Sequence, residues 1–220
     1  LISSELSDLV NLSKSKFKNN YARALCYQLF ENNGVIKREK VHEMIKNITK
    51  EDRLILRKAG IKIGRYHIFL PRMLKPAAVD LRVKLWKLYY DEDKKYVIPK
   101  SGLNFFKNET EKNNKFLLIC GFENFNKFYI RVDILERLFI KILENTKDGV
   151  FKIDSDMINL IGCSKENFYK LLDLMQYKTK NKKEDLFVYK PRFLKSVNKK
   201  KYTKVNKDSP FEKLAELRFR

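Results

Sequence analysis

The sequence predicts a mainly α-helical, α+β fold with two winged-helix-like units, small β hairpins and a C-terminal amphipathic helix. Hydrophobic residues occupy 44% of the 220 positions, which is enough for a packed core, and the seven Gly and five Pro favour helices over a loop-rich β fold. Apolar residues also recur three and four positions apart in several stretches, and short β-like runs separate these stretches. These observations together predict short helices with small sheets between them.

Residues 1–20 are predicted to form a short N-terminal helix, and residues 21–75 are predicted to form the first winged-helix-like unit. In the N-terminal part, Leu6, Leu9 and Val10 would share one side of a helix.

The first unit is expected to open with a helix over residues 21–34, which Gly34 would end. Two further helices follow, and the second of them has Thr49 as its expected N-cap and Gly60 as its expected stop. Residues 61–70 alternate or run apolar, as β structure does. The order of elements is therefore helix, two helices and a β segment.

Residues 76–127 are predicted to be a connecting segment made of a helix, a loop and a strand. Pro76 suits the first turn of the helix. The stretch 91–115 is polar and broken by Pro and Gly, so a loop is expected there, and the apolar run at 115–120 is interpreted as a buried strand.

Residues 128–194 are predicted to form a winged helix-turn-helix. A long helix over 131–146 is followed by a short strand, two helices around the turn at 162–164, and a hairpin rich in lysine. The apolar residues expected to hold the last helix in place are Phe168, Leu171, Leu172 and Met175, against Ile158 and Ile161.

The two units also resemble each other in sequence. Each has a Gly-Val turn, two helices and an apolar β segment, and each closes on Pro-Arg-x-Leu, at residues 71–74 and 191–194. An internal repeat is one interpretation, and chance similarity between short helical segments is the other.

Residues 195–220 are predicted to be a basic linker and a terminal helix. The linker, 195–208, is rich in lysine, and the helix has a capping box formed by Ser209 and Glu212. This helix would be amphipathic and would need a surface on which to dock.

Charge is the strongest global signal in the sequence. There are 48 Lys and Arg against 27 Asp and Glu, which gives a formal net charge of +21. Such an excess attracts polyanions and releases counterions from a phosphate backbone, so RNA or DNA is the expected partner. AT-rich coding DNA also inflates lysine, and this is the alternative explanation of part of the excess.

Motifs of the common catalytic and metal sites are missing from the sequence. Cys26, Cys120 and Cys163 have neither zinc spacing nor a disulfide framework, so we expect reduced thiols, and His42 and His67 suggest no metal site. No Gly-Lys dipeptide occurs, so there is no phosphate-binding loop of the P-loop type. No catalytic residue, metal or cofactor is predicted within this chain.

The expected location is the cytoplasm, with no membrane partner. No apolar run approaches the roughly 18 residues of a membrane span, and no positively flanked apolar segment stands at the start, so no signal peptide is expected. The first residue is Leu1 rather than Met, which suggests a piece of a longer protein.

Residues 56–86 carry a fairly specific pattern of glycine, proline and alanine. Its members are Gly60, Ile61, Ile63, Gly64, Leu70, Pro71, Leu74, Pro76, Ala77 and Ala78. This pattern resembles the C-terminal region of bacterial homologues of the ATP-dependent RNA helicase of the mitochondrial degradosome, which belong to superfamily two. The stretches INLIGCSKENF and SPFEKLAELR also resemble the terminal part of those proteins.

The resemblance implies that the parent protein is an ATPase that unwinds RNA or DNA, with ATP and magnesium bound by a motor upstream of Leu1. None of the helicase motifs is present here, so no catalytic residue of that family can be carried over. The leading hypothesis is therefore a non-catalytic accessory module that holds the nucleic-acid backbone.

The predicted nucleic-acid-binding residues lie on the last helix, the hairpin and the basic linker. They are Lys165, Tyr169, Lys170, Lys178, Lys180, Lys182, Lys183, Lys199, Lys200 and Lys201. Lysines would hold phosphates, and Tyr169 could stack on a base. Glu166 and Asp173 on the same helix would repel phosphate, which favours holding the backbone over reading a sequence.

Two other functions stay open. The chain could be a protein-interaction scaffold that docks the helicase core or a ribonuclease. It could also be a stand-alone winged-helix DNA-binding regulator, which would favour a stable dimer and a sharp preference among duplex sequences.

Overall fold

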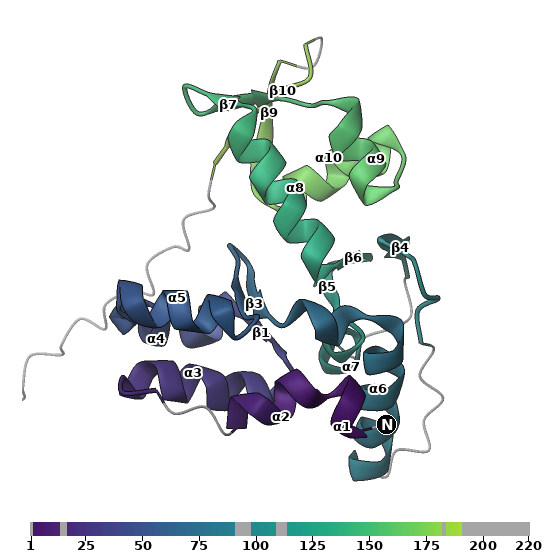
Figure 1. The fold of residues 1–220 in the computed structure, drawn as a ribbon. Helices are drawn as coiled ribbons and strands as arrows, with labels where there is room; N and C mark the ends of the chain where they lie inside the picture. The colour runs from purple at the N-terminus through teal and green to yellow at the C-terminus, as the bar shows by residue number, and fades with distance from the viewer. Residues whose placement is uncertain (1, 14–16, 91–97, 109–113, 182–183, 191–220) are drawn as a thin grey trace, which may run out of the picture. The chain divides into compact units, whose positions relative to one another are not determined.

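The computed structural model describes residues 2–13, 17–90, 98–108, 114–181 and 184–190. The chain divides into two compact units, Leu1–Tyr189 and Lys190–Arg220. All the elements below belong to the first unit, so the predicted linker and terminal helix lie outside the described residues. The described part is a helical α+β fold with small antiparallel sheets, as the sequence predicts (Figure 1).

The N-terminal helix is divided into two pieces. Helix α1 covers Ile2–Glu5 and α2 covers Ser7–Ser13, with the chain turning at Leu6. Leu6, Leu9 and Leu12 are buried together in the core of the first part of the chain.

The next segment follows the predicted order and adds detail. Its helices and strands are α3 Asn20–Glu31, β1 Val35–Lys37, η1 Arg38–Val41, α4 His42–Asn47, α5 Lys50–Lys58, β2 Lys62–Ile63, β3 His67–Phe69 and η2 Pro71–Leu74. The Thr49 hydroxyl accepts the backbone N–H of Asp52, which confirms it as the N-cap of α5. Gly60 follows α5 in the left-handed region, with φ +85°. The strands pair in the order β1-β3-β2.

Helix α6, Pro76–Tyr90, begins at the predicted proline. Its Arg82 is almost fully buried, and the guanidinium donates to the backbone oxygens of Asn33, at 2.6 Å, and of Met73. Burial lowers the pKa of Arg82 to about 10. These bonds fasten α6 to the segment before it.

The predicted strand at 115–120 is wrong, because Asn114–Ile119 form helix α7. Phe116, Leu117 and Ile119 are its buried side chains, and the buried Cys120 follows directly after it, so buried positions recur three and four apart as on a helix face. A short apolar run fits a buried helix as well as a strand, so periodicity alone could not decide between them.

The strands of this region lie on either side of α7 in the sequence. They are β4 Phe105–Lys107, inside the stretch predicted to be a loop, β5 Phe122–Phe125 and β6 Phe128–Arg131, and they pair in the order β4-β6-β5.

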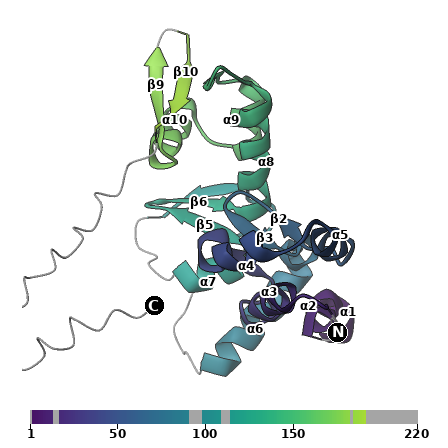
Figure 2. The same cartoon turned by 90° about the vertical axis from the view of Figure 1, so that its left-hand side faces the viewer.

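The last segment has the predicted helix, strand, helix, turn, helix and hairpin (Figure 2). Its elements are α8 Val132–Glu144, β7 Thr146–Lys147, β8 Val150–Lys152, α9 Ser155–Ile161, α10 Lys165–Leu174, β9 Tyr177–Asn181 and β10 Leu186–Tyr189. The strands pair in the order β7-β8-β10-β9. The predicted apolar residues of α10 are buried in one core, with Ile161 buried and Ile158 packed against it.

The two segments of the predicted repeat share their order of elements. The series α3, β1, α4, α5, β2, β3 corresponds to α8, β8, α9, α10, β9, β10, and the pairing β1-β3-β2 corresponds to β8-β10-β9. Pro71–Leu74 form η2, whereas the second Pro-Arg-x-Leu lies outside the described residues. The assignment of both units to the winged-helix class stays a prediction.

Candidate nucleic-acid interface

A short turn connects α9 to α10, and Gly162 and Ser164 determine its conformation. Gly162 ends α9 in the left-handed region, with φ +76°, and its N–H donates to the carbonyl of Ile158 at 2.9 Å. The Ser164 hydroxyl then accepts the N–H of Asn167 at 3.3 Å and begins α10. This turn fixes which face of α10 is buried and which is exposed to solvent.

Lys165 and Tyr169 are joined through one carboxylate. The Lys165 ammonium lies 2.7 Å from Asp185 Oδ2, and the Tyr169 hydroxyl donates to Asp185 Oδ1. Hydrogen bonds from Lys165 and Tyr169 lower the pKa of Asp185, and bonds with Asp185 and Tyr169 raise the pKa of Lys165. The ammonium is therefore charged, but its charge is already opposed by a carboxylate.

The Tyr169 ring is also packed. It stacks on Phe187 with centroids 5.5 Å apart and an interplanar angle of 27°, and Lys165 Nζ lies 5.6 Å from its centroid. Phe187 covers one face of the ring, so the predicted stacking of a base would require the other face.

The remaining predicted residues differ in their surroundings. Lys178 forms an ion pair with Asp173, whereas Lys170 and Lys180 are exposed. Lys182, Lys183, Lys199, Lys200 and Lys201 lie outside the described residues.

A groove of about 530 Å³ lies between α10 and the β4-β6-β5 sheet. Helix α10 supplies one wall, with Asn167, Tyr169, Lys170, Asp173 and Leu174. The other wall comes from Lys107 at the end of β4 and from Asn126, Lys127 and Phe128 at the turn between β5 and β6.

Lys107, Asn126 and Lys127 were missed by the sequence analysis. The signal that could have found two of them is the spacing of the β-like runs FENF and FYIR, which only Asn126 and Lys127 separate, because two-residue loops are the commonest hairpin connections. Asn126 indeed has φ +60°, a left-handed value that asparagine tolerates in turns. No sequence pattern indicates Lys107, because Lys107 reaches the groove only when β4 pairs with β6.

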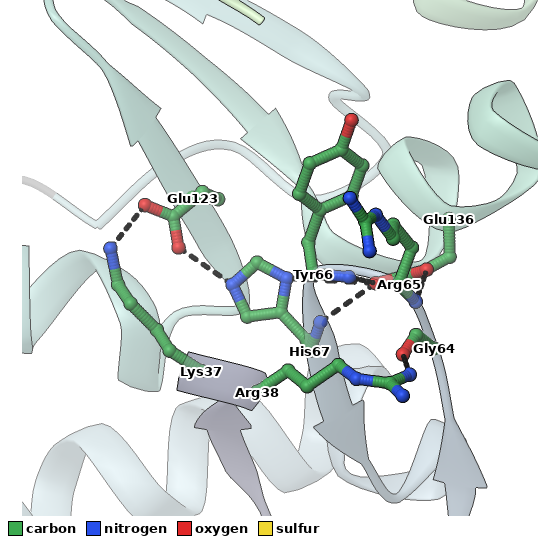
Figure 3. A network of polar contacts seen from close by, with 8 residues as sticks. All are labelled: Lys37, Arg38, Gly64, Arg65, Tyr66, His67, Glu123 and Glu136. Carbon is green, nitrogen blue, oxygen red and sulfur yellow. Dashed lines mark hydrogen bonds and ion pairs between the residues drawn. The ribbon is translucent and has the colours of Figure 1, made fainter. Parts of the chain in front are cut away.

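A second polar cluster is buried where the β2–β3 turn meets α8 (Figure 3). The Glu136 carboxylate accepts the backbone N–H groups of Arg65, Tyr66 and His67, at 2.6, 2.8 and 2.8 Å. A Cβ on Gly64 would come within 2.3 Å of this carboxylate, so glycine is required by close approach. The carboxylate therefore joins the first repeat to the second.

His67 extends this cluster to Glu123 on β5. The His67 ring is 1% exposed; its Nε2 lies 2.6 Å from Glu123 Oε2, and Lys37 donates to Glu123 Oε1 at 2.5 Å. Burial alone would lower the pKa of His67, but its interactions with Glu123 and Glu136 outweigh burial and raise it above 6.5. Burial likewise raises the pKa of Glu123, but its bonds with His67 and Lys37 outweigh that effect and lower it below 4.5.

The His67 cluster fits a structural role better than a catalytic one. With the His67 ring 1% exposed and the Glu123 side chain 8% exposed, a substrate has no access to either group. Within the described ranges, no group of three or more His, Cys, Asp or Glu side chains could hold a metal ion. None of the helices described here has the length and apolar character that crossing a bilayer requires.

Comparison of the chain with protein-family models, curated proteins and solved structures finds no match.

Proposed function

We propose that this chain is a non-catalytic accessory module that holds the backbone of RNA or DNA for an ATP-dependent helicase in the cytoplasm. The observation that carries the proposal is the groove at α10, where Lys107, Lys127 and Lys170 line one concavity. The net charge of +21 supplies the long-range attraction that such a surface needs. The helicase parentage rests on the resemblance of residues 56–86, and ATP and magnesium belong to the motor of that parent.

The acidic residues of α10 favour contact with the backbone over reading of bases. Glu166 is exposed near the start of the helix and Asp173 lines the groove. Each carboxylate would meet phosphates on both sides if α10 entered a major groove, and like charges in close contact are unfavourable. Lysine to phosphate contacts carry no sequence information, so weak sequence preference is expected.

A protein-interaction scaffold is the second candidate, and the end of α6 favours it. Leu88 and Tyr89 are 78% and 82% exposed, and Tyr90 is 52% exposed. Adjacent exposed apolar and aromatic side chains of this kind often mark contacts with another protein, and the helicase core or a ribonuclease would be such a partner.

Binding at several salt concentrations separates the two candidates. Single-stranded RNA, duplex RNA and duplex DNA would each be titrated with the chain between about 50 and 200 mM salt, the range over which phosphate contacts weaken steeply. The log of the association constant should fall by roughly 0.7–0.9 per log unit of salt for each neutralised phosphate. Flat and negligible binding to all three would instead support the scaffold.

A further inference from the structure

We infer that the groove between α10 and the β5–β6 turn takes an unpaired nucleic-acid strand in preference to a duplex. This inference rests on the proposed function and names the substrate class of the same site. Three observations carry it: the second wall beside α10, the volume of the groove and the chemistry of its lining.

The second wall prevents α10 from entering a duplex. A helix with its side chains is about 10–12 Å across, and the major groove of B-DNA is about 12 Å wide, so the helix alone fills it. The β5–β6 turn stands beside α10 and shares the groove with its Asn167, Lys170 and Asp173. A duplex that received α10 would therefore meet Asn126 and Lys127 with its phosphate backbone.

A duplex of RNA is disfavoured for a related reason. Its deep, narrow major groove does not admit side chains, and its minor groove is wide and shallow. Neither surface can follow a concavity between a helix and a turn, whereas a single strand bends freely along it. The volume of about 530 Å³ lies within the range of pockets that hold one small ligand, about 300–1,000 Å³.

The lining suits a phosphodiester and its nucleoside. Lysine residues come from both walls, with Lys107 and Lys127 on one and Lys170 on the other. Asn126 and Asn167 add amide groups that donate and accept hydrogen bonds, as base edges require.

The rest of the lining does not oppose this assignment. Phe128 and Leu174 contribute apolar surface to the groove. The one carboxylate, Asp173, forms an ion pair with Lys178, so its repulsion of phosphate is offset.

The test compares a groove variant with a control of equal charge. The groove variant carries Lys107→Glu, Lys127→Glu and Lys170→Glu, and the control carries Lys46→Glu, Lys58→Glu and Lys84→Glu at exposed positions that do not line the groove. Fluorescence anisotropy would measure binding of one RNA strand alone and of the same strand annealed to its complement. Thermal melting of each variant reports its folding, and Lys170→Ala, a single change at an exposed site, serves if a triple variant unfolds.

For the wild type, we expect the single strand to bind at least about tenfold more tightly than the duplex. The groove variant should lose at least about tenfold in single-strand affinity. The slope of its log association constant against log salt concentration should become shallower by about two, because each of three lost phosphate contacts contributes roughly 0.7. The control should stay within about threefold of the wild type, because distant exposed charges are screened.

Three different results would each contradict one claim: the groove as the binding site, the preference for a single strand, or the proposed function. A groove variant that binds as tightly as the control places the nucleic acid elsewhere. Equal affinity of the wild type for strand and duplex removes the preference while leaving the proposed function intact. Absence of binding to either by the wild type removes the proposed function itself.

Discussion

At the scale of single residues, Gly64 and Glu136 show how a small side chain and a charged one depend on each other. The carboxylate of Glu136 accepts three backbone N–H groups in the turn that Gly64 opens. An anion held by several backbone amides is strongly stabilised, but only if no Cβ stands in its way.

Gly64→Ala should therefore destabilise the protein by about 1–3 kcal/mol, the usual cost of forcing extra atoms into a packed site. Urea unfolding of the wild type and the variant measures the change. The matched control repeats the substitution in a Glu136→Ala background, where the clash is gone and the added cost should be clearly smaller. Equal costs in the two backgrounds would mean that the strain lies elsewhere.

His67 and Glu123 give the stability a defined dependence on pH. The raised pKa of His67 means that the native state holds a proton that the unfolded state releases above pH 6.5, so this contribution is complete below pH 6.5 and is lost as pH rises through the native pKa. The lowered pKa of Glu123 acts in the opposite direction. Its contribution is complete above pH 4.5 and is lost as pH falls through the native value.

The free energy of unfolding should accordingly decline on both sides of the range from pH 4.5 to 6.5. His67→Gln should remove the alkaline decline, as followed by urea unfolding at a series of pH values. His42→Gln, which changes the exposed histidine of α4, should keep it. An alkaline decline that persists in His67→Gln would show that another group causes it.

At the scale of elements, the turn between α9 and α10 positions every groove residue of α10. Ser164→Ala removes the acceptor for the N–H of Asn167 and should cost about 1 kcal/mol, as loss of an N-cap does. Asn167 lines the groove, so single-strand affinity should fall as well, because the first turn of α10 frays.

Chemical unfolding and anisotropy on the same preparation measure both effects. Ser101→Ala, at an exposed turn position, is the control and should change neither. A Ser164→Ala protein as stable as the wild type would contradict the role assigned to this cap.

Helix ends that depend on residues of the helix itself could be predicted from the sequence, whereas elements that depend on residues distant in the chain could not. Thr49, Pro76 and Gly162 begin or end their own helices as caps or first-turn residues. These helix ends could therefore be predicted from a few neighbouring residues. Helix α7 has no such marker, since an apolar run of six residues suits a helix or a strand until its neighbours are known.

The groove illustrates the same limit. Lys170 could be proposed from the helix pattern alone, but Lys107 and Lys127 reach the site only because β4 pairs with β6 and the β5–β6 turn comes to stand beside α10. Ion pairs such as Lys165 with Asp185 were likewise hidden, because the two residues lie 20 positions apart in the chain.

At the scale of the whole described unit, two repeats with the same order of elements have different surroundings. Helix α10 of the second segment supplies one wall of the lysine-lined groove, whereas the turn between β2 and β3 in the first segment is occupied by Glu136 of the second. An internal repeat was one of two interpretations of the sequence, and neither predicted that one segment would supply a carboxylate to the backbone of the other. That contact joins Glu136 to the backbone of residues 65–67, which lies about 70 positions away in the chain, too far for any local pattern to link them.

The strand pairing also separates the described chain into a part before α6 and a part after it. Sheet β1-β3-β2 lies within residues 35–69 and the other described sheets lie within residues 105–189, so no ladder among the described strands spans α6. A polypeptide severed after α6 would lose covalent continuity but none of these ladders. Of its two pieces, made separately, one would carry the carboxylates of Glu123 and Glu136 and the other would carry the groups that bond to them. We expect the two pieces to reassemble on mixing, because these bonds form between them.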